Sequence, residues 1–157
     1  MVEENETGHG VNRVLVVDDH PDTIEVLSVM FQVLGYETRG EVRGRDAHRA
    51  AREFEPDLIL LDIGLPDLSG YEIVHAMRDD PRVRDRFIVA VTGWSRTKDI
   101  VHAKQAGFDA HFVKPIDLAK IRQILRLTSS DLRRRAQNAR RALALEHLRL
   151  AVPGAHG

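Results

Sequence analysis

Short apolar runs alternate with longer amphipathic stretches along most of this chain. Five runs of four or five residues set the alternation, the second of them weaker than the rest: residues 14–17, 36–39, 58–61, 87–91 and 110–113. Short apolar runs bounded by polar residues indicate buried strands. The stretches between them carry apolar residues at spacings of three and four, as at Ile24, Leu27 and Phe31, which indicates amphipathic helices. The pattern therefore predicts five strand–helix units.

Several residues indicate where the predicted helices end. Gly35 follows the first amphipathic stretch in the place of a C-cap, and Gly107 follows the fourth. The third stretch stops before Pro81, and Asp117 is an N-cap candidate for the fifth. We expect helices over five stretches: residues 24–34, 45–54, 71–78, 96–106 and from 117 onward.

Regular alternation of strands and helices is typical of an α/β fold. It predicts a doubly wound, five-stranded parallel sheet with helices on both faces. Strands of such a sheet are buried on both sides and read as continuous apolar runs, as residues 58–61 do. Ligands of such sheets bind at the carboxyl ends of the strands, so polar residues at these ends are candidates for function.

Polar residues follow four of the five predicted strands directly. They are three carboxylates, a hydroxyl and an ammonium group: Asp18, Asp19, Asp62, Thr92 and Lys114. Because the carboxyl ends of parallel strands share one edge of the sheet, we expect these side chains to converge. Three nearby carboxylates repel one another unless a cation joins them, and Mg²⁺ prefers oxygen ligands. The hydroxyl and the ammonium group would then hold an oxygen-rich anion such as a phosphoryl group.

The composition excludes several classes of protein. With 157 residues, 43% hydrophobic and 30% charged, the chain suits one globular domain with appendages. It has no cysteine, which excludes disulfide frameworks and thiolate metal sites, and its net charge of −1 does not suggest nucleic-acid binding. No apolar stretch approaches the roughly 18 residues of a membrane span. Residues 1–11 lack the apolar core of a signal peptide, and we expect a disordered leader on a cytoplasmic protein.

Four motifs resemble those of a known family, the receiver domains of two-component response regulators. VLVVDDHPD, LILLDIGLPDLSGYE, VAVTG and FVKP each match a family motif, in the family's order. The spacings also match, with 43 residues from Asp19 to Asp62, 30 on to Thr92 and 22 on to Lys114. The resemblance covers residues 12–127 and implies a flavodoxin-like strand order, 2-1-3-4-5.

The resemblance assigns roles to the carboxylates. Asp62 would accept a phosphoryl group from a sensor histidine kinase or a histidine phosphotransfer protein. Asp19 and Asp62 would bind Mg²⁺ directly, together with the backbone carbonyl of Gly64, and Asp18 would bind it through water. The chain would catalyse only its own phosphorylation and dephosphorylation, and the modified surface would bind an output protein.

The resemblance also assigns roles to the remaining motif residues. Thr92 and Lys114 would each bind an oxygen of the phosphoryl group. The Lys114–Pro115 peptide bond would be cis. Pro66 and Gly70 would shape the loop after the acceptor.

Three positions depart from the usual family pattern. Receivers usually carry Tyr or Phe as a switch side chain three residues before the lysine, where this chain has His111, followed by Phe112. With Thr92, His111 would therefore form the switch, or it would be a half-exposed strand residue. Gly64 has no side chain to orient a water. Trp94 would cover the phosphoryl site, contact a partner, or pack on the fourth helix.

A basic segment follows the part of the chain that resembles receivers. Residues 128–150 hold six arginines and two acids, a local charge of +4. Apolar residues recur at spacings of four and three, with Glu146 interrupting them: Leu132, Ala136, Ala139, Leu143 and Leu150. We expect residues 128–157 to be a basic helical extension with a disordered end, too short for a helix-turn-helix output domain. It would be solvated, pair with a second copy as a homodimer, or dock on a partner, and DNA contact is the least favoured alternative.

Two other classes of function are open to comparison. An aspartate-nucleophile phosphohydrolase also uses acids at strand ends and Mg²⁺, but it typically carries its nucleophile after the first strand rather than the third. A DNA-binding regulator would rely on the basic extension. The eight histidines show no metal-ligand spacing, and no phosphate-binding loop of the G-x-x-x-x-G-K-[ST] type is present.

Overall fold

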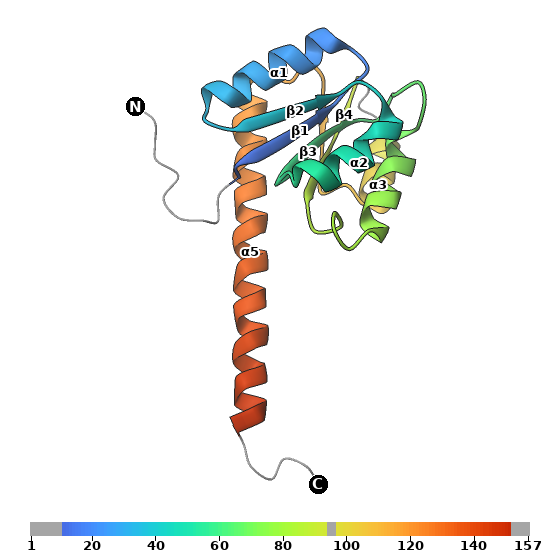
Figure 1. Cartoon of the computed structure of the whole chain (residues 1–157). Helices are drawn as coiled ribbons and strands as arrows, with labels where there is room; N and C mark the ends of the chain where they lie inside the picture. The colour runs from blue at the N-terminus through green and yellow to red at the C-terminus, as the bar shows by residue number, and fades with distance from the viewer. Residues whose placement is uncertain (1–10, 94–96, 152–157) are drawn as a thin grey trace.

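Five parallel strands form the centre of the molecule, in the order β2-β1-β3-β4-β5 (Figure 1). The computed structural model describes residues 11–93 and 97–151. The strands are β1 (Arg13–Val17), β2 (Glu37–Glu41), β3 (Leu58–Asp62), β4 (Phe87–Thr92) and β5 (Ala110–Val113). The helices are α1 (Pro21–Val33), α2 (Gly44–Phe54), α3 (Gly70–Asp79), α4 (Thr97–Ala106) and α5 (Leu118–Ala151). The predicted α/β fold and its strand order are confirmed.

The largest difference from the predicted strands is in β2. It runs from Glu37 to Glu41, whereas the weak apolar run was at residues 36–39. Its extent follows its partner, because all five of its residues pair with β1, from Arg13 opposite Glu37 to Val17 opposite Glu41. An edge strand has one neighbour and a partly solvated surface, so its apolar signal is weak.

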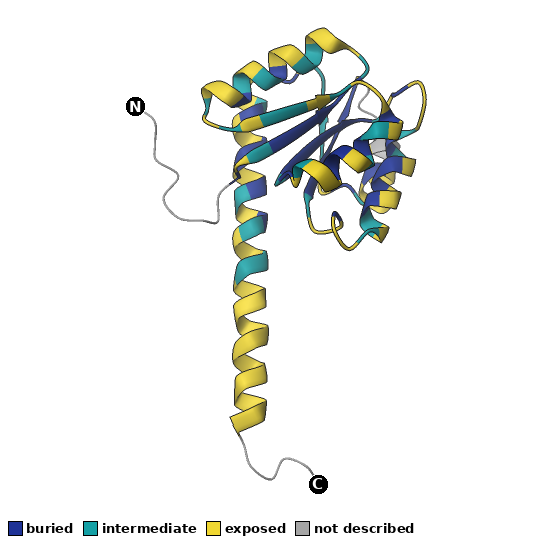
Figure 2. Cartoon of the chain, viewed as in Figure 1, coloured by how far each residue is buried: buried dark blue, intermediate teal, exposed yellow. Residues whose placement is uncertain are grey.

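The sheet separates two hydrophobic clusters, and its central strands are buried (Figure 2). One cluster contains side chains of α2, α3 and α4, such as Ala47 and Met77. The other contains side chains of α1 and α5, such as Phe31 and Ile121. Successive residues of β1 and β3 contribute to opposite clusters, which explains their continuous apolar runs.

The predicted helix ends agree with the backbone. Gly35 and Gly107 have φ angles of 94° and 120°, in the left-handed region that glycine adopts without a steric penalty. At the start of α5, the Asp117 carboxylate accepts the Lys120 backbone N–H at 2.9 Å, as expected of an N-cap.

Helix α5 continues without a break for 34 residues and leaves the domain about halfway along (Figures 1 and 2). Its first half packs on the sheet, and contact with the domain extends past residue 127 to Leu132, which lies against the second cluster. At the other end of the chain Val11, within the residues expected to form the leader, is buried in the same cluster. The packed domain therefore includes Val11 and the turns of α5 through Leu132.

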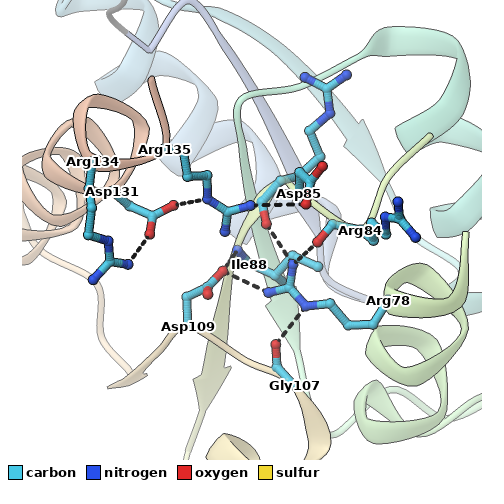
Figure 3. Close-up of polar contacts among 10 residues, drawn as sticks. Arg78, Arg84, Asp85, Ile88, Gly107, Asp109, Asp131, Arg134 and Arg135 are labelled. Atoms are coloured by element: carbon cyan, nitrogen blue, oxygen red, sulfur yellow. Dashed lines mark hydrogen bonds and ion pairs between the residues drawn. The ribbon is translucent and has the colours of Figure 1, made fainter. Parts of the chain in front are cut away.

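Charged side chains attach the middle of α5 to the domain (Figure 3). The buried Asp131 carboxylate accepts hydrogen bonds from Arg134 and Arg135, each at 2.6 Å. Arg135 also reaches Asp85, in the loop before β4, at 3.4 Å. The Asp131 contacts lie within α5, and the contact between Arg135 and Asp85 links the helix to the domain.

Candidate functional site

Three charged side chains from separate strand ends meet at the carboxyl edge of the sheet. The Lys114 ammonium group lies 2.7 Å from an Asp18 carboxylate oxygen and 3.0 Å from one of Asp62. The strand register produces this meeting, because Val17 pairs with Leu61 and Thr92 pairs with Val113. Each polar residue thus follows or ends its strand at nearly the same level, as the sequence predicted.

Two of the three carboxylates of the site are almost closed to solvent. Asp18 and Asp62 are 2% and 7% exposed, and Thr92 is also 7% exposed. Burial alone would lower the pKa of Lys114, but its hydrogen bonds to the two carboxylates outweigh burial and raise this pKa. Lys114 therefore keeps its positive charge and offsets part of the negative charge beside it.

Asp19 lies at the rim of the site, next to His20. The His20 ring Nδ1 is 3.1 Å from an Asp18 oxygen and 3.2 Å from an Asp19 oxygen. His20 is the N-cap residue of α1, but its ring makes no capping hydrogen bond and is turned toward the carboxylates instead. The sequence analysis missed His20, whose position directly after the acid pair was the available signal.

The loop after β3 contacts the Asp62 side chain through its backbone. The Gly64 backbone N–H donates to the Asp62 carboxylate at 2.9 Å. Asp67, further along the loop, accepts the backbone N–H groups of Gly44 and Arg45, both at 3.0 Å. The bond from Arg45 is the main reason why the pKa of Asp67 is lowered. The loop is thus anchored to the first turn of α2, a long-range contact that the sequence analysis did not identify.

Gly70 is required by close packing against the backbone at the start of the loop after β3. A Cβ atom there would lie 2.8 Å from the Ile63 Cα and 3.0 Å from the Asp62 carbonyl oxygen, and both neighbours are backbone atoms. We predict that Gly70→Ala lowers the free energy of unfolding by about 1–3 kcal/mol, the usual cost of overpacking. Urea titration followed by circular dichroism would measure it. Gly93→Ala is the matched control, because a Cβ there would meet no atom of the described residues within 4 Å. Equal stability of Gly70→Ala and wild type would contradict this packing.

The other predicted site residues lie as follows. Thr92 ends β4, and its backbone carbonyl accepts the Lys114 N–H at 2.8 Å. The Lys114–Pro115 peptide bond is cis, as expected. His111 is half-buried on β5 opposite Ala90. This position does not decide whether His111 is a switch side chain or an ordinary strand residue. Trp94 lies outside the described residues.

The donor set fits Mg²⁺. Oxygen donors of Asp18 and Asp19, together with a nitrogen of His20, lie within 4.8 Å of one another. Lys114 contacts both Asp18 and Asp62. Its single positive charge does not balance the three carboxylates of Asp18, Asp19 and Asp62. An oxygen-binding divalent cation would balance the remainder.

The described part of the chain offers no membrane-spanning segment. Within residues 11–93 and 97–151, none of the helices is both long enough and apolar enough to cross a bilayer.

Comparison with known sequences gives one family. The family model described as response regulator receiver domain matches residues 14–126. The polar-differentiation response regulator DivK of Brucella anthropi is 33% identical over 118 residues, which are 75% of this chain and 96% of DivK. The DNA-binding dual master transcriptional regulator RpaA of Synechocystis is 31% identical over 120 residues, which are 74% of this chain. The match covers 50% of RpaA, so this chain spans half the length of that relative.

Comparison with solved structures agrees. The chemotaxis response regulator CheY4 of Vibrio cholerae has a TM-score of 0.70 and 26% identity, over 75% of this chain and 98% of that one. A CheY-like receiver domain protein of Methanospirillum hungatei has a TM-score of 0.73 over 80% of this chain and 99% of that one. At 21% identity, the second similarity supports the fold alone.

Proposed function

The chain belongs to the response regulator receiver family, whose members accept phosphoryl groups in two-component signalling, and we propose that Asp62 is its phosphoacceptor. The contact of Lys114 with both Asp18 and Asp62 is the observation that carries this proposal. It joins the ends of three strands at one place and puts a positive charge beside the Asp62 carboxylate.

In the proposed reaction, a carboxylate oxygen of Asp62 attacks the phosphorus of a phosphohistidine. An O–P bond forms as the P–N bond breaks, and the leaving imidazole takes up a proton. The Gly64 N–H holds one Asp62 oxygen, so the carboxylate is oriented before the donor arrives. Lys114 exchanges its contact with Asp62 for a phosphoryl oxygen, and the Thr92 hydroxyl donates to another.

Asp19, Asp62 and the Gly64 carbonyl would hold Mg²⁺ directly, and Asp18 would hold it through water. When bound, the ion would neutralise charge on the transferring group, and such neutralisation together with positioning supplies most of the catalysis of phosphoryl transfer.

Localising the modification tests this proposal. Wild-type protein given acetyl phosphate and Mg²⁺ should acquire one acyl phosphate, and none when EDTA removes the metal. Borohydride reduction followed by peptide mapping should place the modification at Asp62. A modification on another residue would exclude Asp62 as the acceptor.

The proposal includes partners and a setting. The donor would be a sensor histidine kinase or a histidine phosphotransfer protein in the cytoplasm, and the output would be a separate protein. The chain would act on no substrate beyond its own aspartyl phosphate. A second copy that pairs through α5 is one candidate partner for the extension, and an unrelated protein is the other.

The phosphoryl group on Asp62 should be long-lived, because Gly64 has no side chain to orient the hydrolytic water. We predict that Gly64→Asn speeds phosphate loss by roughly tenfold, the scale of one positioning interaction. The site has space for the change, since a Cβ on Gly64 would meet only an Asp62 oxygen among the described residues, at an ordinary 3.6 Å.

The lifetime is measured by loading the protein, removing the donor and following phosphate release. Gly64→Ala is the control, because it adds a Cβ without a polar group and should keep the wild-type rate. If Gly64→Asn and Gly64→Ala release phosphate equally fast, water orientation at residue 64 does not set the lifetime.

A further inference from the structure

The part of α5 beyond the domain continues the side of the helix that faces the domain. Leu132 packs on the second hydrophobic cluster, whereas Leu143 and Leu150 are 62% and 80% exposed. They follow Leu132 by 11 and 18 positions, about three and five turns at 3.6 residues per turn, so all three lie on one side. With Ala136 and Ala139 they form what we call the lower stripe of α5.

The lower stripe is the candidate contact surface because it extends an existing packed face. Where the helix leaves the domain, a groove of about 770 Å³ lies between them. Leu132 and Ala139 line it on the helix, and the rest of its lining is polar, with four aspartates, three arginines and Asn138. A helix placed along the stripe would therefore reach the underside of the domain. Leu145 and Leu148 are also exposed, but they lie on the opposite side of α5, where no packed face leads to them.

Positive charge borders the lower stripe on both sides. Residues 132–151 hold six arginines and one glutamate, so their net charge is 6 − 1 = +5. Arg133 and Arg140 directly follow stripe residues, Arg149 directly precedes one, and all three are exposed. Arg135 also borders the stripe and pairs with Asp131 and Asp85.

This charge pattern disfavours pairing with a second copy. Asp131, which is buried and pairs with Arg134 and Arg135, is the one acid directly beside a stripe residue. Along the exposed part of the stripe no bordering position carries an acid, so a symmetric pair in either orientation would bring arginines together without compensation. A parallel pair would also place Glu146, which interrupts the stripe, against its own copy. A different helix with acidic side chains at its borders would bring together neither two sets of arginines nor two copies of Glu146.

We propose that the lower stripe of α5 binds an amphipathic helix of another protein, whose apolar stripe is bordered by glutamate or aspartate side chains. Apolar contact with Leu143 and Leu150 holds the partner, and its acids pair with Arg133, Arg140 and Arg149. This surface is remote from Asp62, so the interaction can be tested on the unphosphorylated chain and does not depend on the proposed acceptor.

A fluorescent synthetic helix of three heptads, with leucine on its stripe and glutamate at its borders, is the probe. Full-length protein should raise its fluorescence anisotropy saturably. A matched peptide with lysine at the borders should bind at least roughly tenfold more weakly. Added salt should weaken the binding of the glutamate peptide. Equal binding of both peptides, or binding of neither, would overturn the proposal.

Matched variants locate the binding surface. The double variant Leu143→Ser and Leu150→Ser should lose the glutamate peptide, whereas Leu145→Ser with Leu148→Ser should keep it. All four side chains are exposed, and circular dichroism checks that the helix is retained. Equal losses in the two double variants would overturn the assignment to this stripe.

Two further measurements test the alternatives, a second copy of this chain and nucleic acid. Sedimentation that shows a wild-type dimer dissociated by Leu143→Ser and Leu150→Ser would assign the stripe to a second copy. Duplex DNA that binds more tightly than the glutamate peptide, with no dependence on these leucines, would assign the extension to nucleic acid.

Discussion

Protein carrying Asp62→Asn is expected to take up no phosphoryl group from acetyl phosphate. The amide cannot supply the carboxylate oxygen that attacks phosphorus, so the rate should fall by roughly a thousandfold or more, as when the nucleophile of an enzyme is removed. Asparagine has nearly the same shape and can still accept the Gly64 N–H. The loss should therefore be chemical rather than structural, and intact-protein mass spectrometry would measure it.

An exposed acid provides the control for this substitution. Asp79 lies on α3 with its side chain 75% exposed, and Asp79→Asn should be labelled like wild type. Thermal unfolding should show that Asp62→Asn is folded and no less stable than wild type, because it removes one charge from an acidic cluster. Stoichiometric labelling of Asp62→Asn would exclude Asp62 as the acceptor.

The second large effect is expected from Lys114→Met, which removes the ammonium group that contacts both Asp18 and Asp62. Two buried carboxylates would then face each other without it. Breaking a fully buried ion pair costs about 3–5 kcal/mol, but Lys114 is 27% exposed, so we expect about 1–2 kcal/mol. The melting temperature in EDTA should fall by roughly 5 °C.

Mg²⁺ distinguishes this electrostatic cause from lost packing. A divalent ion at the carboxylates should restore most of the melting temperature of Lys114→Met, and it should raise that of wild type less. Lys104→Met, on α4, is the matched control, and its melting temperature should respond to Mg²⁺ as that of wild type does. If Mg²⁺ leaves the melting temperature of Lys114→Met unchanged, the lysine does not act by balancing these acids.

Lys114 also links the site to pH. Its pKa is raised in the folded protein, so the stability it contributes is fully present below the pKa of the unfolded chain and is lost as the pH rises through the folded value. Between neutral pH and the ordinary lysine pKa, this contribution is constant. The difference in stability between wild type and Lys114→Met should therefore shrink only in strongly alkaline solution.

Local patterns were sufficient for the fold and for the place of the site. The run at residues 58–61 ends at Asp62, and a parallel sheet brings its strand ends to one edge, so the meeting of Asp18, Asp62 and Lys114 could be predicted before any contact was known. The family, the strand order and the cis bond before Pro115 are likewise confirmed. The individual roles of these residues stay predictions.

The sequence by itself determined which segments form strands and helices, because burial on one or both sides of an element leaves a period that can be read along the chain. Only the tertiary structure decided which side chains meet across distant segments. Asp67 accepting N–H groups at the start of α2 and Arg135 reaching Asp85 are such contacts. The extent of α5 on the domain was decided in the same way, since Leu132 and Leu143 share one helical period and differ only in whether the sheet lies beside them.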